Sequence, residues 1–148
     1  MSCKYLRGFT MIELMITLVI LAILAAIAFP SYQESVLKAK RTEGRAALMK
    51  TMQQQERYYS LHTTYLAFSS ASIDANESRF SWFSGENAQT SFYEISAQSC
   101  KEKTLRECVL LKAQPGTSKV NAKHRDPKCG TLSLTSSGEK MAGADGCW

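Results

Sequence analysis

The run FTMIELMITLVILAILAAIAF, residues 9–29, is apolar almost throughout. At about 1.5 Å of rise per residue, a helix of this length crosses a hydrocarbon core of roughly 30 Å. The eight residues before it, MSCKYLRG, carry Lys4 and Arg7 and no acid, and positive charge at this place keeps the preceding end cytoplasmic. The pattern predicts one membrane segment followed by an exported domain.

Two ordinary interpretations of the apolar run stay open. The first is a secretory signal peptide, because Ala26 and Ala28 form a small-x-small pattern before a possible cut. The run is longer than a usual signal core, however, and Glu13 lies near its start. The second is a plain membrane anchor for an unrelated periplasmic domain, which hydropathy alone does not exclude.

Glu13 calls for a more specific interpretation. A carboxylate in an apolar helix costs about 2.5–3.5 kcal/mol near the bilayer centre, so it indicates a functional site with a partner. If the chain is cut after Gly8, the new α-amino group of Phe9 is a positive charge. Glu13 of one subunit would then pair with the amine of a neighbour during docking. The alternative is a carboxylate that reaches the headgroups from the helix end.

The string RGFTMIEL, residues 7–14, resembles the prepilin cleavage motif of type IV pilins and type II secretion pseudopilins. In that family a membrane-bound prepilin peptidase cuts after the glycine and methylates the new N-terminal residue. By position, the resemblance makes Gly8 the residue before the cut, Phe9 the N-methylated residue and Glu13 the glutamate that aids assembly. A glycine at the cut lets the backbone enter a tight protease cleft. Residues 1–8 are then a leader peptide.

A single long helix is expected after the cut, from Phe9 to about Tyr59 and near 75 Å in length. Pro30 should interrupt it by a kink or local melting, because proline removes one backbone donor and clashes with the preceding turn. Residues 9–29 are apolar on all sides and suit a membrane or a bundle of like helices, whereas residues 30–59 are amphipathic. The run Gln53–Gln55 is interpreted as part of the solvated face, with a partner surface as the alternative. The expected buried face comprises Leu37, Gly44, Leu48, Met52 and Tyr59.

Residues 60–148 form the expected globular head. Residues 60–90 show no sustained period and indicate a connecting loop, anchored by Phe80, Trp82 and Phe83; Trp82 and Phe83 could instead be an exposed contact. Three strands with alternating apolar residues are expected next. Their inward residues are Tyr93, Ile95 and Ala97, then Val109, Leu111 and Ala113, then Leu132 and Leu134. An antiparallel meander of three to four strands would pack one face on the helix, which makes the fold class α+β.

Five cysteines are present, and Cys3 belongs to the expected leader. The other four lie in the C-terminal third, and an even set beyond an export segment suggests two disulfides in an oxidising compartment. Of three possible pairings, Cys100–Cys108 and Cys129–Cys147 are favoured because each closes a short local loop. A metal site is not expected, because the chain has no C-x-x-C pair.

The charge of the chain allows a nucleic-acid partner without demanding one. The formal net charge is +5, and removal of Lys4 and Arg7 with the leader would leave +3, a mild excess that equally fits a soluble surface. A basic stretch in the C-terminal third could contact DNA phosphates or be a solvated loop with a turn at Asp126-Pro127. Its residues are Lys119, Lys123, His124, Arg125 and Lys128. No nucleophile motif or phosphate loop stands out, so neither an enzyme nor a cofactor is expected.

Further segments resemble PilE-type minor pilins. They are RTEG at residues 41–44, ERYY at 56–59, and KCGTL at 128–132 followed by the final Cys147-Trp148. The resemblance implies the type IV pilin fold, with the last cysteine pair enclosing a surface loop, whereas Cys100–Cys108 departs from the simplest family pattern.

The resemblance also implies a function and a place in the cell. The chain would be a structural subunit of a type IV pilus, most simply a minor pilin, in pilus biogenesis, twitching motility, adhesion or DNA uptake. Its partners would be other pilins, the prepilin peptidase and the inner-membrane assembly platform. It would lie in the inner membrane with a periplasmic head before it joins a cell-surface pilus. The alternatives are a type II secretion pseudopilin, which the C-terminal cysteines disfavour, a DNA-binding minor pilin, and an anchored periplasmic enzyme.

Overall fold

The computed structural model describes residues 9–148, so the predicted leader and its Gly8 cut lie outside the described residues. Residues 9–148 contain one long helix, α1 (Met11–His62), a short 3₁₀ helix, η1 (Glu77–Arg79), and four strands. The strands are β1 (Tyr93–Ser99), β2 (Val109–Pro115), β3 (Leu132–Thr135) and β4 (Lys140–Met141). Two compact units divide the chain, the first ending at Leu37 and the second running from Lys38 to Trp148.

The first unit contains the N-terminal part of α1, and its side chains from Met11 to Glu34 are exposed. By length and composition this helix could cross a membrane, with a mean hydropathy of 2.8 over its most apolar window. Its backbone stays helical through Pro30, so the predicted melting at this residue is wrong. A proline removes only one backbone donor, and the flanking residues carry the helix across the gap. A kink at Pro30 stays a prediction.

In the second unit, α1 buries one face that is more polar than the expected stripe. Gly44 and Leu48 are buried as predicted, together with Arg41, Ala47, Thr51 and Gln55. Assigning Gln55 to the solvated face was wrong. Its side chain is fully buried, donates to the Leu66 carbonyl at 2.7 Å and accepts from the Leu66 amide at 3.0 Å. This amide therefore satisfies the backbone of the chain leaving the helix.

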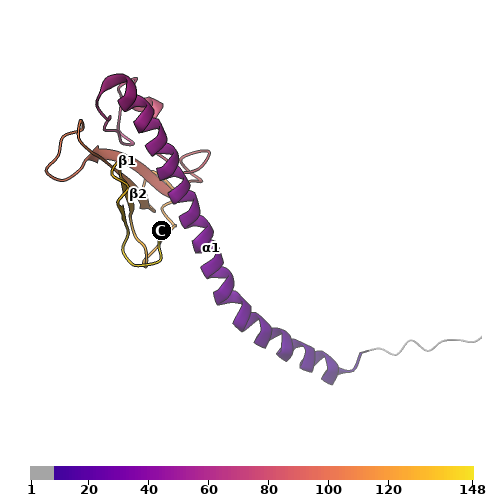
Figure 1. The fold of residues 1–148 in the computed structure, drawn as a ribbon. Coiled ribbons are helices and arrows are strands. Elements are labelled where there is room, and N and C mark those ends of the chain that lie inside the picture. The colour runs from indigo at the N-terminus through magenta and orange to yellow at the C-terminus, as the bar shows by residue number, and fades with distance from the viewer. Residues whose placement is uncertain (1–8) are drawn as a thin grey trace, which may run out of the picture. The chain divides into compact units, whose positions relative to one another are not determined.

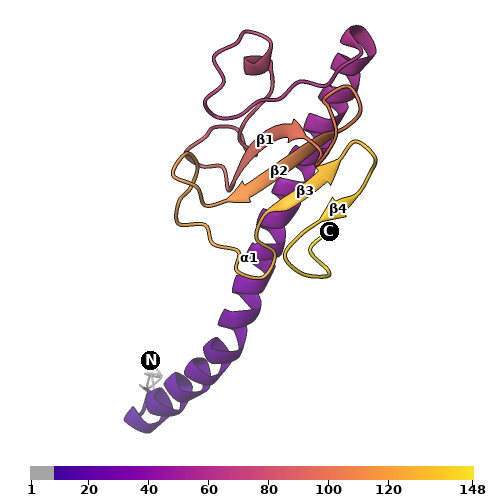
Figure 2. The same ribbon diagram turned by 90° about the vertical axis from the view of Figure 1, so that its left-hand side faces the viewer.

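The four strands form one antiparallel sheet in the order β1-β2-β3-β4, which confirms the meander and the α+β class. Figures 1 and 2 show the sheet beside the second half of α1. The predicted inward residues of β1 and β2 are buried, and the residues between them are half-buried or exposed. Gly44 permits a close approach, because a Cβ there would lie 2.9 Å from the Tyr93 ring. Strand β4 has only two residues and was not predicted by name.

The segment between α1 and β1 is mostly a connecting loop, as expected, with η1 inside it. Phe80 is buried and stacks on Phe68 with ring centroids 5.1 Å apart. The Ile95 amide donates to the Trp82 carbonyl at 2.7 Å, and Phe83 bridges to Glu94. These contacts anchor the loop on the first strand.

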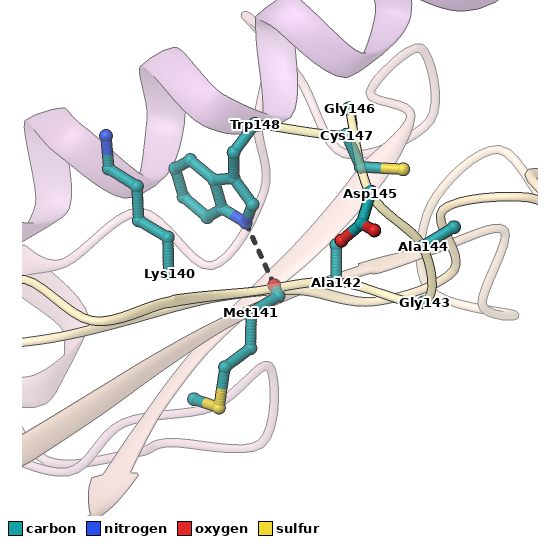
Figure 3. Close-up of a pocket in the computed structure, with 9 residues that line it drawn as sticks. All are labelled: Lys140, Met141, Ala142, Gly143, Ala144, Asp145, Gly146, Cys147 and Trp148. Atoms are coloured by element: carbon teal, nitrogen blue, oxygen red, sulfur yellow. Dashed lines mark hydrogen bonds between the residues drawn. The ribbon is translucent and has the colours of Figure 1, made fainter.

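Within the described part of the chain, two disulfides close local loops, and they join the pairs that loop length favoured. Cys100 is bonded to Cys108, and Cys129 is bonded to Cys147. Beyond the second bond, the indole nitrogen of Trp148 donates to the Met141 carbonyl at 2.9 Å, as Figure 3 shows. Residues 140–148 line a shallow surface pocket there.

Candidate nucleic-acid interface

The connection between β2 and β3, residues 116–131, carries every basic residue that the sequence singled out for DNA. This segment is called the β2–β3 loop below. Its four cationic side chains are exposed: Lys119, Lys123, Arg125 and Lys128. His124, the fifth member of the basic stretch, is instead buried, with 3% of its surface exposed, and so is Asp126. From residue 123 to residue 126, exposed cations alternate with buried side chains. The loop therefore displays its cations from a fixed backbone, whereas a freely solvated loop would show no such alternation.

Asp126 fastens the loop to α1 through Arg41. The guanidinium donates from Nε to Oδ2 at 2.7 Å and from Nη2 to Oδ1 at 2.8 Å, a bidentate pair with little exposure of either side chain. The same Oδ1 accepts from the Cys129 amide at 3.0 Å. Hydrogen bonding to Arg41 lowers the pKa of Asp126 below its usual value, although burial opposes the shift. The carboxylate thus joins the helix, the loop and the start of the second disulfide.

His124 forms the second anchor of the loop. Its ring lies against Phe92 and Tyr93, with centroids 5.2 and 5.3 Å apart. Burial lowers the pKa of His124, and the nearby charge of Lys40 lowers it further. Among the described residues, neither its Nε2 nor the Tyr93 hydroxyl has a hydrogen-bond partner. A neutral imidazole therefore fits this place, and protonation would put a charge in a partly apolar contact.

The start of the loop is fixed by its backbone. Gly116 has φ of +60°, and a Cβ there would lie 1.9 Å from the His124 carbonyl oxygen, so only glycine fits. The Asn121 amide donates to the Ser91 carbonyl at 3.0 Å, and Val120 is buried. These contacts hold the middle of the stretch between Lys119 and Lys123.

A second group of cations lies at the other end of β2 and was not predicted. Lys101, Lys103 and Arg106 are exposed in residues 100–108, called the β1–β2 loop below. Strand β2 has seven residues, so about 20 Å separates the two loops. The signal for this second group in the sequence is the polar string between Cys100 and Cys108, which contains all three cations.

The predicted N-terminal site is described from Phe9 onward. Phe9 is largely exposed. Glu13 Oε2 accepts from the Thr10 amide at 2.9 Å and from the Thr10 hydroxyl at 2.8 Å, while the Glu13 amide donates to the Thr10 hydroxyl at 3.3 Å. This reciprocal arrangement is a capping box, which satisfies backbone donors at the start of α1. In the described chain, the carboxylate therefore has a partner within its own helix.

Family models match nearly the whole chain up to residue 133. Residues 30–133 match the model described as "Type IV minor pilin ComP, DNA uptake sequence receptor". The chain belongs to this family. Residues 3–29 match the model of the prokaryotic N-terminal methylation motif. The chain is therefore a type IV minor pilin and a membrane-anchored pilus subunit, as the resemblances at residues 7–14, 41–44, 56–59 and 128–132 led us to expect. The pilin family is a structural family rather than a family of enzymes.

Curated relatives of this pilin are similar over a short part of their length. The type IV major alpha-pilin of Moraxella bovis is 51% identical over 47 residues, which is 30% of each chain. Fimbrial protein EcpC of Eikenella corrodens is 54% identical over 37 residues, 25% of this chain and 24% of the relative. The major pilin PilA of Myxococcus xanthus is 39% identical over 62 residues, 42% of this chain and 28% of the relative. The chain thus spans less than a third of each relative. A type IV pilin structure from Shewanella oneidensis matches 75% of this chain and 96% of its own, with 25% identity and a TM-score of 0.47.

Proposed function

We propose that this minor pilin is a DNA-binding subunit of a type IV pilus, and that the β2–β3 loop contacts the phosphate backbone. The observation that carries the proposal is the alternation along residues 123–126, which presents Lys123 and Arg125 outward while His124 and Asp126 are buried. The description of the family as a DNA uptake sequence receptor supports the same function.

Phosphate contact fits the composition of the loop. Each Lys or Arg that neutralises a phosphate releases a condensed counterion, so binding weakens with salt in proportion to the number of contacts. Lys119, Lys123, Arg125 and Lys128 could supply up to four such contacts. Phosphate contacts position a protein on DNA without carrying base information, so the proposal concerns affinity rather than sequence preference.

The test is a charge reversal in the full-length protein in detergent micelles. Binding of the Lys123→Glu, Arg125→Glu variant to a fluorescent duplex of mixed sequence is measured by anisotropy over a range of NaCl. Loss of two phosphate contacts should weaken binding by about 10- to 30-fold at 0.15 M salt and reduce the salt slope by about 2.

The matched control reverses Lys50 and Arg57, two exposed cations of α1. It has the same change in net charge, and its salt slope should stay at the wild-type value. Equal losses in the two variants would mean that net charge alone attracts DNA, and an unchanged affinity in the loop variant would overturn the proposal. Sheared filaments should contain the loop variant, which separates DNA binding from assembly.

Assembly rests on a second proposal about the N-terminus. We infer that prepilin peptidase cuts after Gly8, that Phe9 is then N-methylated, and that Glu13 pairs with the amine of a neighbouring subunit. The match to the methylation motif supports this order of events. Glu13 would have to release part of its Thr10 cap, and the new amine would supply the compensating charge. An inner-membrane platform would then move the subunit into a surface pilus.

Mass spectrometry of the mature N-terminus tests the second proposal. An N-methylated Phe9 in both membranes and sheared filaments is the expected result. The same terminus in membranes alone would point to a pseudopilin or an assembly-priming subunit, and a chain starting at Phe29 or retaining Met1 would contradict the processing.

A further inference from the structure

The buried Arg41–Asp126 pair has a role that stability does not explain. Replacing a buried ion pair by apolar side chains is often neutral or stabilising, because taking two charges out of water costs about as much as their attraction returns. Such a pair is better suited to fixing a geometry. Here it joins two positions 85 residues apart in the chain, and the atoms that it fixes lie directly beside the exposed cations.

The pair fixes the backbone of the loop around Asp126. Asp126 follows Arg125 and precedes Lys128, and its carboxylate accepts from Arg41 and from the Cys129 amide. The backbone carbonyl of Asp126 accepts a hydrogen bond from the Gly130 amide at 2.9 Å. The position of the Asp126 backbone therefore sets where the side chains on both sides begin.

The bidentate geometry adds orientation to attachment. A guanidinium fork and a carboxylate are both planar, so two parallel hydrogen bonds restrict rotation as well as distance. His124 lies two residues earlier against Phe92 and Tyr93, which gives the same stretch a second attachment. Two attachments on alternating residues define which way Lys123 and Arg125 point.

We propose that the Arg41–Asp126 pair is a positioning device that holds Lys123, Arg125 and Lys128 in the arrangement that DNA phosphates require. This inference rests on the proposed DNA-binding function. Asp126 does not touch DNA, and its buried carboxylate raises the affinity for a polyanion by holding the cations around it in place. A simple count of charges predicts the opposite effect, namely that the negative charge of Asp126 lowers the affinity for DNA. An experiment can therefore distinguish positioning from net charge.

The decisive variant is Asp126→Asn in the full-length protein. The amide keeps the size of the side chain and an acceptor for the Cys129 amide, but it removes one negative charge from the loop. Charge counting predicts tighter binding to the same fluorescent duplex. Positioning predicts binding weakened by about 10-fold at 0.15 M salt and a salt slope reduced by about 1 to 2, because fewer phosphates are neutralised together.

The control is Asp145→Asn, which removes an exposed carboxylate from the C-terminal loop without touching the pair. It should bind DNA as tightly as the wild type or slightly more tightly. The salt slope separates positioning from stability, because a less stable but folded protein keeps its number of phosphate contacts. Far-UV circular dichroism below the melting temperature identifies the folded variants.

If the Asp126→Asn variant does not fold, the Arg41→Lys variant tests the positioning role of the pair. Lysine keeps both charges of the pair and loses only the fork, so it should weaken binding and lower the salt slope with no change in net charge. Wild-type affinity and slope in the folded variants would overturn the positioning role while leaving DNA binding in place. If the wild-type protein binds no DNA and reversal at Lys123 and Arg125 changes nothing, both proposals fail together.

Discussion

The two basic loops at the ends of β2 are ordered in different ways. The β1–β2 loop is closed by its own disulfide, and its Glu107 carboxylate accepts from the amide and hydroxyl of Thr104 within the loop. Its links outward go to backbone carbonyls, with Tyr59 donating to Arg106 and the Tyr65 amide donating to Leu105. The β2–β3 loop is held by buried side chains. Exposed cations are therefore common to both loops, and the loops differ in the way their backbone is held.

The largest expected effect is a loss of stability when the buried cation that holds the β2–β3 loop is removed. Arg41→Met leaves Asp126 buried without its cation, which should lower the free energy of unfolding by about 3–5 kcal/mol. Lys103→Met removes an exposed cation of the β1–β2 loop and should stay within about 0.5 kcal/mol of the wild type. Urea unfolding of both full-length variants measures the difference. Similar losses would mean that the two loops depend on their charges in the same way.

The next effect compares the two disulfides. Cys129 and Cys147 are both fully buried, whereas Cys100 is only half-buried. For sequence separations of 18 and 8, the loop-entropy model gives about 3.2 kcal/mol for the Cys129–Cys147 bond and about 2.6 kcal/mol for the other. Paired alanine substitutions should therefore cost more for Cys129–Cys147, since cavities add to the entropy. A greater loss from the Cys100–Cys108 pair would reverse our ranking of the two loops.

The smallest expected effect is a response to acid. The folded pKa of His124 lies below the ordinary value of 6.5, mainly because of burial, so the unfolded chain binds the proton more readily. The contribution of the neutral His124 ring to the free energy of unfolding is complete above pH 6.5 and declines as the pH falls below that value. Asp126, with its pKa held below 3.8 by Arg41, loses its contribution only at lower pH. The melting temperature should therefore fall between pH 7 and pH 5 before any effect of Asp126.

A His124→Leu variant isolates this response. It should flatten the melting profile between pH 7 and pH 5 and leave the decline at lower pH unchanged. Thermal melts followed by circular dichroism at matched ionic strength provide the measurement. A profile in the variant that still follows the wild type over this range would show that other groups cause the decline.

Much of the fold could be predicted because its signals are local. Alternation at Tyr93, Ile95 and Ala97 reflects a strand with one face on the core, and the apolar run at residues 9–29 reflects one long helix. The position of strand β4 was not predicted, because two exposed residues are too few to show an alternating pattern. The single long helix was expected, and only the local melting offered for Pro30 as an alternative to a kink was wrong.

The site was harder to predict because its partners are distant in the chain. The basic stretch was visible, but its interpretation as either a DNA contact or a solvated loop depends on burial. His124 was grouped with the exposed basic residues, and Asp126 was assigned to a surface turn. Nothing in their own segment shows that Phe92 and Tyr93 cover the histidine or that Arg41 binds the aspartate. Gln55 was misplaced for the same reason, because its partner Leu66 lies beyond the end of the helix.

The attachment of the β2–β3 loop to α1 also has a mechanical consequence. Arg41 is part of the helix, so a pull on the loop reaches α1 through two parallel charge-assisted hydrogen bonds as well as through the sheet. The Cys129–Cys147 bond, three residues after Asp126, gives the loop a covalent stop beside them. Tension on a bound polymer would therefore be shared among the helix, the cross-link and the two strands that flank the loop.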